Sequence, residues 1–122
     1  MNGVLVVIGV FFFGGLGSAA RFAIHRGVVR ADPSDFPLGT FIVNIVGALL
    51  LGTLYGAHAT SDFMEVAGIG FLGGFTTFST WMYESERLNV DGYADGAIRN
   101  VAVSAAVGFL AVTIGVAIGQ LL

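Results

Sequence analysis

Hydroxyl and amide side chains gather within two apolar stretches of the sequence. The stretch GTFIVNIVG places Thr40, Asn44 and Gly47 at i, i+4 and i+7, the spacing of residues on one face of a helix. Polar side chains inside a membrane are costly and tend to face the bundle interior or a water-filled path. The pattern favours an ion path, and the alternative is that Asn44 only joins two helices by hydrogen bonding.

The second polar cluster is GGFTTFST, residues 73–80. Gly73 and Gly74 lower helix propensity and so make a break in the helix less costly. A break inside the membrane frees backbone groups that must be buried, bind an ion or line water. Unwound carbonyls suit a hard cation such as Na⁺. The alternative is a kinked helix whose hydroxyls bond back to the i−4 carbonyls, and spacing alone leaves both open.

Aromatic residues are interleaved with these hydroxyls: Phe71, Phe75, Phe78 and Trp81. An aromatic ring has a negative face and a positive edge. Rings presented edge-on would stabilise a small dehydrated anion without a full charge that would trap it. Rings that face lipid or pack between helices give the same sequence pattern.

The elements that must position these residues are membrane helices. The chain is 56% hydrophobic and 11% charged, with a mean hydropathy of +0.89, and a soluble domain usually carries about twice that charged fraction. A span needs about 20 mostly apolar residues. The sequence predicts an all-α, multi-pass protein of the cell membrane, with residues 1–122 forming one domain in the lipid bilayer. The expected spans are about 3–24, 38–59, 63–84 and 96–121.

Small residues indicate close helix packing. The chain has 19 glycines, and most lie inside the spans. Small residues four apart let membrane helices approach closely. Four short spans cannot readily enclose an ion pathway and also bury their small-residue faces, so we expect an oligomer. The small-xxx-small pairs are Gly52 with Gly56, Gly14 with Ser18, and Gly115 with Gly119.

The charges set an orientation and exclude several functions. All five basic residues fall in the first and third linkers, so the positive-inside rule makes those linkers cytoplasmic and both termini external. The absence of a dense basic run argues against nucleic-acid binding. No Asp or Glu lies near the centre of a span, which argues against a proton-coupled pump. No nucleophile–base pair is apparent, so we expect no enzyme. The basic residues are Arg21, Arg26, Arg30, Arg87 and Arg99.

Three strings together resemble the CrcB/Fluc family of fluoride channels: GGLGSAARF, GTFIVNIVG and GFLGGFTTFST. The resemblance covers essentially the whole chain. It implies a passive, fluoride-selective channel of two antiparallel subunits, each with its third helix broken at mid-membrane. Because fluoride enters cells as neutral HF and ionises in the cytoplasm, such a channel lets F⁻ leave down its electrochemical gradient and lowers cytoplasmic fluoride.

The resemblance also implies roles for individual residues. A structural Na⁺, which is not transported, would be held by the backbone carbonyls of Gly73 and Thr76 in each subunit. Arg21 would draw anions into a vestibule, and Glu84 follows the motif without an assigned role. The implied pore residues are Phe78, Trp81, Asn44, Thr40, Ser79, Thr80 and Ser104.

The sequence departs from the family pattern in three ways. Trp81 replaces the second pore phenylalanine, and Asn100 stands where many relatives have an aromatic residue. The one-sided arginines suit a single orientation, so the partner is either an oppositely oriented paralogue or a second copy in a dual-topology homodimer. A non-conducting or half-pore subunit is an alternative. So is a small multidrug-type transporter, which would need a membrane-embedded Glu, whereas the first span has no charged residue before Arg21.

Overall fold

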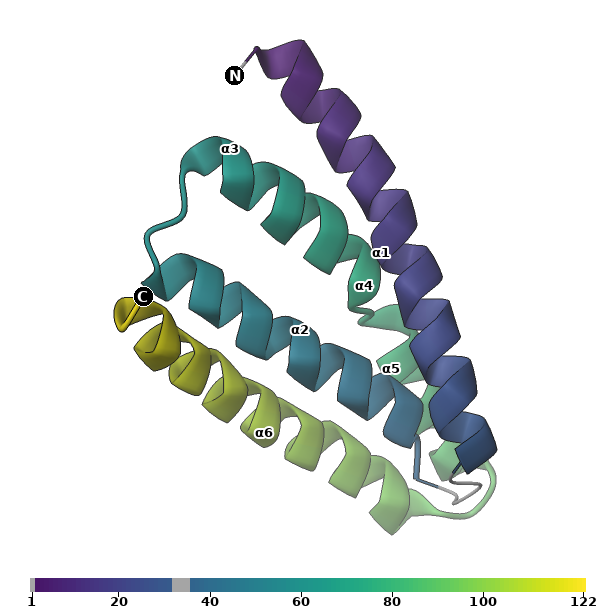
Figure 1. Cartoon of the computed structure of the whole chain (residues 1–122). Helices are drawn as coiled ribbons and strands as arrows, with labels where there is room; N and C mark the ends of the chain where they lie inside the picture. The colour runs from purple at the N-terminus through teal and green to yellow at the C-terminus, as the bar shows by residue number, and fades with distance from the viewer. Residues whose placement is uncertain (1, 32–35) are drawn as a thin grey trace.

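The structure is a computed structural model that describes residues 2–31 and 36–122. Throughout these residues the only regular secondary structure is helical (Figure 1). The expected all-helical fold is therefore confirmed. The helices are α1 (Gly3–Ala31), α2 (Leu38–Gly56), α3 (Ser61–Phe63), the π-helix η1 (Met64–Leu72), α4 (Gly73–Phe75), α5 (Ser79–Val90) and α6 (Ala94–Gln120).

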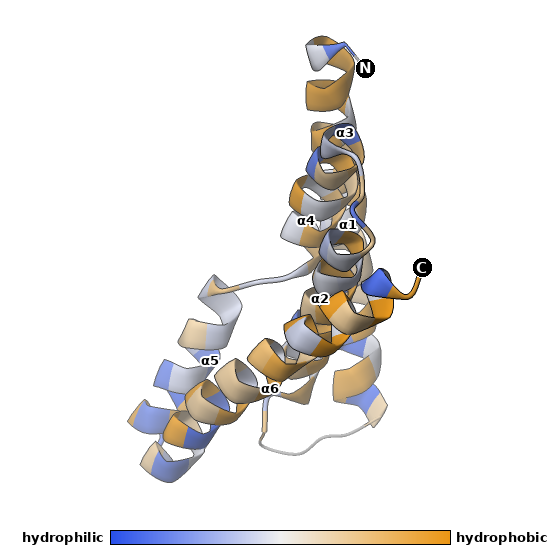
Figure 2. Ribbon diagram, turned by 90° about the vertical axis from the view of Figure 1, so that its left-hand side faces the viewer, coloured by the Kyte–Doolittle hydropathy of each residue, from blue (hydrophilic) through white to orange (hydrophobic). Residues whose placement is uncertain are grey.

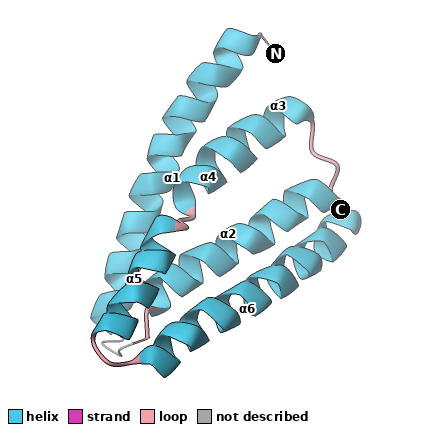
Figure 3. Cartoon of the chain, turned by 180° about the vertical axis from the view of Figure 1, so that it is seen from behind, coloured by secondary structure: helices cyan, strands magenta, loops and turns pink. Residues whose placement is uncertain are grey.

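Helices α2 and α6 lie side by side along their lengths (Figures 1 and 3). A Cβ atom added to Gly52 would lie 2.3 Å from the Val112 carbonyl oxygen, and one added to Gly115 would lie 2.2 Å from that of Leu49. Only glycine permits such a close backbone approach. Two of the three expected small-residue pairs, Gly52 with Gly56 and Gly115 with Gly119, therefore lie in the interface between these two helices.

Helix α1 packs against η1 and α4 through a second close contact. A Cβ atom on Gly74 would lie 2.2 Å from the Gly14 carbonyl oxygen, and the Ser18 hydroxyl donates to the Gly74 carbonyl at 3.3 Å. Gly73 and Gly74 are both helical. The expectation that the helix breaks at these glycines is therefore wrong in detail: Gly74 instead lets α4 approach α1.

The third apolar stretch is nevertheless discontinuous. Residues 61–75 form one helical run, residues 76–78 have no helical structure, and α5 begins at Ser79. After the break, α5 leaves the direction of α4 and packs against α6 (Figure 2). Among the described helices, three are long and apolar enough to cross a membrane, namely α1, α2 and α6. The expected span 63–84 is divided between α3–η1–α4 and α5.

The first helix is longer than the expected span of 3–24. It continues to Ala31, so Arg26 and Arg30 lie on its last turns rather than in a linker. The end of α1, the start of α2 and the α5–α6 connection lie at one end of the molecule, whereas the α2–α3 connection lies at the other (Figure 1). Arg30, Arg87 and Arg99 lie near the ends of α1, α5 and α6 that face these connections, whereas Arg21 lies within α1, opposite the break. The Asp32–Pro33 pair between α1 and α2 lies outside the described residues.

Much of the apolar surface is uncovered in the single chain. Phe11, Phe78 and Phe109 are 82%, 70% and 77% exposed, and the fully buried hydrophobic core is small. In water such a surface would be unstable, because burial of apolar area drives folding. Lipid or another protein must cover these helices.

Candidate functional site

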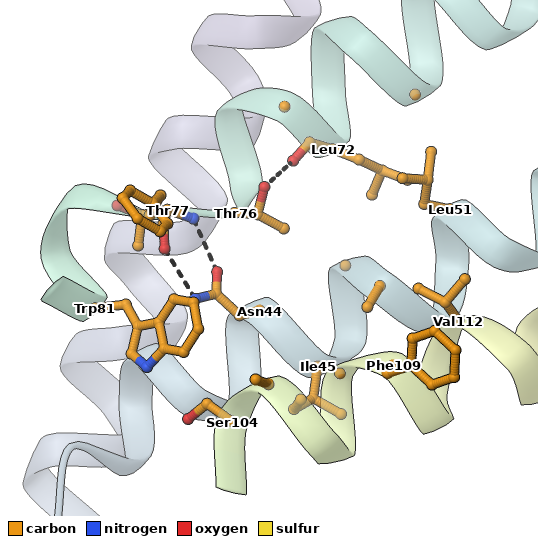
Figure 4. Close-up of a pocket in the computed structure, with 17 residues that line it drawn as sticks. Asn44, Ile45, Leu51, Leu72, Thr76, Thr77, Trp81, Ser104, Phe109 and Val112 are labelled. Carbon is orange, nitrogen blue, oxygen red and sulfur yellow. Dashed lines mark hydrogen bonds between the residues drawn. The ribbon is translucent and has the colours of Figure 1, made fainter. Parts of the chain in front are cut away.

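The side chain of Asn44, on α2, forms hydrogen bonds with the backbone of the non-helical segment 76–78. Its Nδ2 donates to the Thr77 carbonyl, and its Oδ1 accepts from the Thr77 N–H, both at 2.8 Å (Figure 4). The two bonds satisfy both polar backbone groups of Thr77, which the break removes from helical bonding. Asn44 therefore joins α2 to the polar cluster at residues 73–80 by hydrogen bonding, as the alternative to an ion path expected.

The break leaves several carbonyls without their usual helical donors, among them those of Gly73 and Thr76. In a continuing helix the Gly73 carbonyl would accept from the Thr77 N–H, and the Thr76 carbonyl from the Thr80 N–H. The Thr77 N–H instead donates to Asn44, and the Thr80 N–H donates to Thr77 Oγ1 at 3.2 Å. Side-chain acceptors have thus taken both donors. The backbone oxygens of Gly73 and Thr76 thereby lose their helical donors.

Other side chains also touch the end of this helical run. Arg21 of α1 donates to the Thr76 carbonyl at 3.4 Å. The Thr76 hydroxyl bonds back to the Leu72 carbonyl at 2.9 Å, as the kinked-helix alternative expected. The structure therefore combines the two alternatives: the Thr76 hydroxyl bonds to the carbonyl four residues earlier, and the helix then breaks.

A cavity of about 540 Å³ lies beside the break, between α2, η1, α5 and α6 (Figure 4). None of its 17 described lining residues is charged. An ion in this space would meet dipoles and rings rather than a fixed charge. Of the expected functional residues, the lining includes Asn44, Gly73, Thr76, Phe78, Trp81 and Ser104.

Two of the three aromatic residues in the cavity lining, Phe78 and Trp81, contact each other. The rings of Phe78 and Trp81 have centroids 5.8 Å apart and an interplanar angle of 86°, which is an edge-to-face contact. The Trp81 Nε1 donates to the Asn100 backbone carbonyl at 3.2 Å. The indole N–H is therefore already engaged by α6.

Asn100 is buried and joins several polar groups. It is 1% exposed; its Nδ2 donates to Ser85 Oγ at 2.8 Å, and its Oδ1 accepts from the Ser104 hydroxyl at 3.3 Å. Ser85 donates in turn to the Trp81 carbonyl at 2.9 Å. These bonds satisfy the buried amide, which would otherwise be costly.

The remaining expected pore residues lie outside the cavity lining. Thr40 is 1% exposed, and its hydroxyl donates to the Glu84 carboxylate in a close contact. Thr80 Oγ1 accepts from the Thr77 hydroxyl at 3.1 Å, and Ser79 is exposed. The structure thus gives Glu84 a partner on α2, and it separates this polar pair from the wall that contains Asn44.

The side chains of the described residues offer no conventional metal site. Within residues 2–31 and 36–122 no three His, Asp or Glu side chains group closely enough to hold a metal ion. A cation here would need the carbonyl oxygens of the break. Outside the membrane stretches, hydrogen bonding to Tyr83 and attraction by Asp91 raise the pKa of Arg87, so this arginine stays charged.

Sequence reasoning missed Thr77 and Ser85 as individual contributors. Thr77 was one hydroxyl among several in GGFTTFST, yet its backbone is the group that Asn44 holds. Ser85 follows the motif on α5, where only its i+4 spacing from Trp81 indicated a shared face. Its role depends on Asn100, which comes from another helix.

Comparison with known proteins gives a consistent result. Residues 8–116 match the family model described as CrcB-like protein, Camphor Resistance (CrcB). The chain is 45% identical over 118 residues to "Fluoride-specific ion channel FluC 2" of Mycobacterium bovis, covering 97% of this chain and 94% of the relative. It is 42% identical over 121 residues to the protein of the same name from Mycolicibacterium paratuberculosis, covering 99% of each.

A more distant relative, "Fluoride-specific ion channel FluC" of Phocaeicola vulgatus, is 36% identical over 111 residues, covering 88% of this chain and 92% of the relative. These relatives are named as ion channels, not enzymes. With its apolar helices, the chain is a multi-pass integral membrane protein. It belongs to the CrcB family.

Proposed function

We propose that the chain is a subunit of a fluoride-selective channel that lets F⁻ leave the cytoplasm passively. The observation that carries the proposal is the uncharged cavity beside the break, whose wall combines one amide, three hydroxyls and three aromatic rings. Fixed positive charges would hold an anion tightly, whereas neutral donors let it enter and leave. The names of the relatives support fluoride as that anion.

The chain's residues would act on the anion in different ways. Arg21 lies near the break and would attract anions toward it by its charge. Ring edges of Phe78 and Trp81 carry partial positive charge and would stabilise a dehydrated anion. The Ser104 hydroxyl is the candidate hydrogen-bond donor on α6. A membrane potential that is negative inside would drive the anion outward by about 2.3 kcal/mol per 100 mV.

A structural Na⁺ fits the freed carbonyls of Gly73 and Thr76. Neutral oxygens are suitable ligands for a hard cation, and the C-terminal end of the 61–75 helical run carries partial negative charge. A carbonyl has two lone pairs, so the Thr76 oxygen can accept from Arg21 and still face a cation. Bound there, Na⁺ would cross-link two break segments without being transported. Replacing Na⁺ by N-methylglucamine should then lower the melting temperature of the reconstituted protein, and an unchanged value would contradict the site.

The channel would be an antiparallel dimer, as the family resemblance implies, and a second subunit would cover part of the cavity wall and apolar surface that one chain leaves exposed. The second subunit is either another copy or an oppositely oriented paralogue. The five arginines on one side favour the paralogue, in which case this chain is a half-pore subunit. Co-expression with a tagged second copy distinguishes the two: a homodimer is recovered with its tagged copy, whereas an obligate half-pore subunit is not.

The proposed activity is tested by fluoride efflux from liposomes. Purified protein is reconstituted in vesicles loaded with KF, and a fluoride electrode records release after valinomycin is added. We expect efflux only when valinomycin lets K⁺ follow, because the anion moves without a coupled proton. Release of Cl⁻ at the same rate, or no fluoride release from vesicles that contain folded protein and its partner, would contradict the proposal.

A further inference from the structure

A closed set of hydrogen bonds joins α5 to α6 behind the cavity wall. The Asn100 backbone carbonyl accepts from the Trp81 indole at 3.2 Å, and the Asn100 side chain donates to Ser85 at 2.8 Å. Ser85 donates to the Trp81 backbone carbonyl at 2.9 Å. Both the ring and the backbone of Trp81 are therefore tied to one residue of α6. Asn100 itself is 1% exposed and does not line the cavity.

This arrangement determines what Trp81 presents to an ion. An indole has a single N–H donor and no acceptor. Because that N–H donates to the Asn100 carbonyl, the ring offers the cavity only carbon-bound hydrogens and its π face. Figure 4 shows the indole nitrogen on the side toward α6, with the ring system beside Asn44. Trp81 therefore resembles a phenylalanine in its donor chemistry while being larger.

Asn100 also controls the Ser104 hydroxyl. A serine has one hydroxyl proton, and that of Ser104 points to Asn100 Oδ1 at 3.3 Å. Ser104 lines the cavity, so its oxygen is within reach of an ion there. To donate to an anion, the hydroxyl must turn away from Asn100. The long distance to Asn100 Oδ1 makes that exchange inexpensive.

We propose that Asn100 is a positioning residue of the cavity wall, which fixes the Trp81 ring with its N–H turned away from the cavity and supplies the acceptor that an anion displaces at Ser104. The anion part rests on the proposed function. The positioning part stands on the contacts alone and is measured without fluoride.

The single tryptophan makes the positioning directly measurable, since Trp81 is the only source of indole fluorescence. The Asn100→Leu variant keeps the backbone acceptor and a similar volume but removes the bonds to Ser85 and Ser104. We expect the time-resolved anisotropy of Trp81 to gain a fast component, because the link through Ser85 that ties the Trp81 backbone to Asn100 is lost, although the indole bond to the carbonyl of residue 100 remains. The control is Thr113→Val, which removes a hydroxyl on the same helix that bonds only to the Phe109 carbonyl.

Ser85→Ala gives a second test if Asn100→Leu does not fold, because it removes only the link between Asn100 and the Trp81 carbonyl. A fast component in either folded variant, absent from Thr113→Val, supports the positioning role. Wild-type anisotropy in the folded variants would overturn it.

The effect on transport has its own readout. If Asn100 acts through Trp81, Asn100→Leu should change fluoride efflux at least about threefold in the wild-type chain and distinctly less in a Trp81→Phe background. Equal changes in both backgrounds would overturn the link to Trp81.

Fluoride, but not chloride, should also alter Trp81 emission in the wild type, through Ser104 and Asn100, and Ser104→Ala should abolish the response. A response that persists in Ser104→Ala would overturn the displacement at Ser104. Absence of fluoride efflux from the wild type would count against the proposed function and leave the anisotropy result intact.

Discussion

The Asn44→Asp substitution changes a single amide to a carboxylate at the cavity wall. Asp keeps an oxygen that accepts from the Thr77 N–H, but it replaces the NH₂ group that donates to the Thr77 carbonyl at 2.8 Å. The two oxygens then face each other without a proton. Loss of such a partly buried donor costs about 1–3 kcal/mol, so the variant should be less stable but folded.

The added charge has the larger effect on transport. An anion about 5 Å from the carboxylate, at an effective dielectric constant of about 20, is repelled by about 3 kcal/mol. Fluoride occupancy beside Asn44 should therefore fall by roughly two orders of magnitude, and efflux from liposomes should fall with it. The same change at Asn89, an exposed residue on the last turn of α5, is the matched control and should leave efflux unchanged.

Asn44→Leu separates charge from hydrogen bonding, since it loses both bonds to Thr77 and adds no charge. Its efflux should exceed that of Asn44→Asp. Wild-type efflux from folded Asn44→Asp would refute the inference that the anion passes this side chain. Equal losses of efflux in the Asp and Leu variants would assign the effect to the lost hydrogen bonds between Asn44 and Thr77 rather than to electrostatic repulsion.

Three further outcomes are expected. Trp81→Phe should preserve or raise fluoride efflux, because the indole N–H is engaged by α6 and a smaller ring widens the path; a large loss would show that the indole is required. Gly115→Ala should lower the free energy of unfolding by about 3 kcal/mol, and so lower the melting temperature, because the added Cβ would lie 2.2 Å from the Leu49 carbonyl oxygen. Gly108→Ala is the control for that change, since the added Cβ would lie 3.8 Å from its nearest neighbour, Ile45 Cδ1. Equal destabilisation by both variants would contradict the packing argument. A reporter at the C-terminus should respond only from outside the cell, and signal from both sides of the membrane would contradict a fixed orientation.

The helices themselves were predictable because the information lies within each segment. Apolar runs of sufficient length predicted α1, α2 and α6, and glycines four apart predicted the approach of Gly52 and Gly115 to the opposite helix. The end of α1 was not predicted, because the helix continues through polar residues that need not lie in the membrane.

The position of the break depended on contacts between distant segments. Gly73 and Gly74 are the only adjacent glycines in the third stretch, yet the helix continues through them and ends after Phe75. Asn44, more than thirty residues away in sequence, takes both backbone groups of Thr77. Local helix propensity indicated the region of the break, but its exact position depends on hydrogen bonds with another helix.

The polar partners of the site were predictable only in part. Asn44 and Ser104 were marked by their helical spacing or their match to the family, and both line the cavity. The role of Asn100 was not, since its departure from the family pattern gave no sign of what it contacts. Only the packing of α5 on α6 brings it to Trp81 and Ser85.

The central claim is that this chain forms a path for fluoride, and a reversal potential tests it most directly. The protein, with its partner subunit if it requires one, is placed in a planar bilayer with a tenfold fluoride gradient, equal chloride and equal pH on the two sides. The account predicts current that reverses near the fluoride equilibrium potential, about 59 mV in magnitude for a monovalent ion. Reversal near zero, or at a value that follows an imposed chloride or proton gradient, would contradict it.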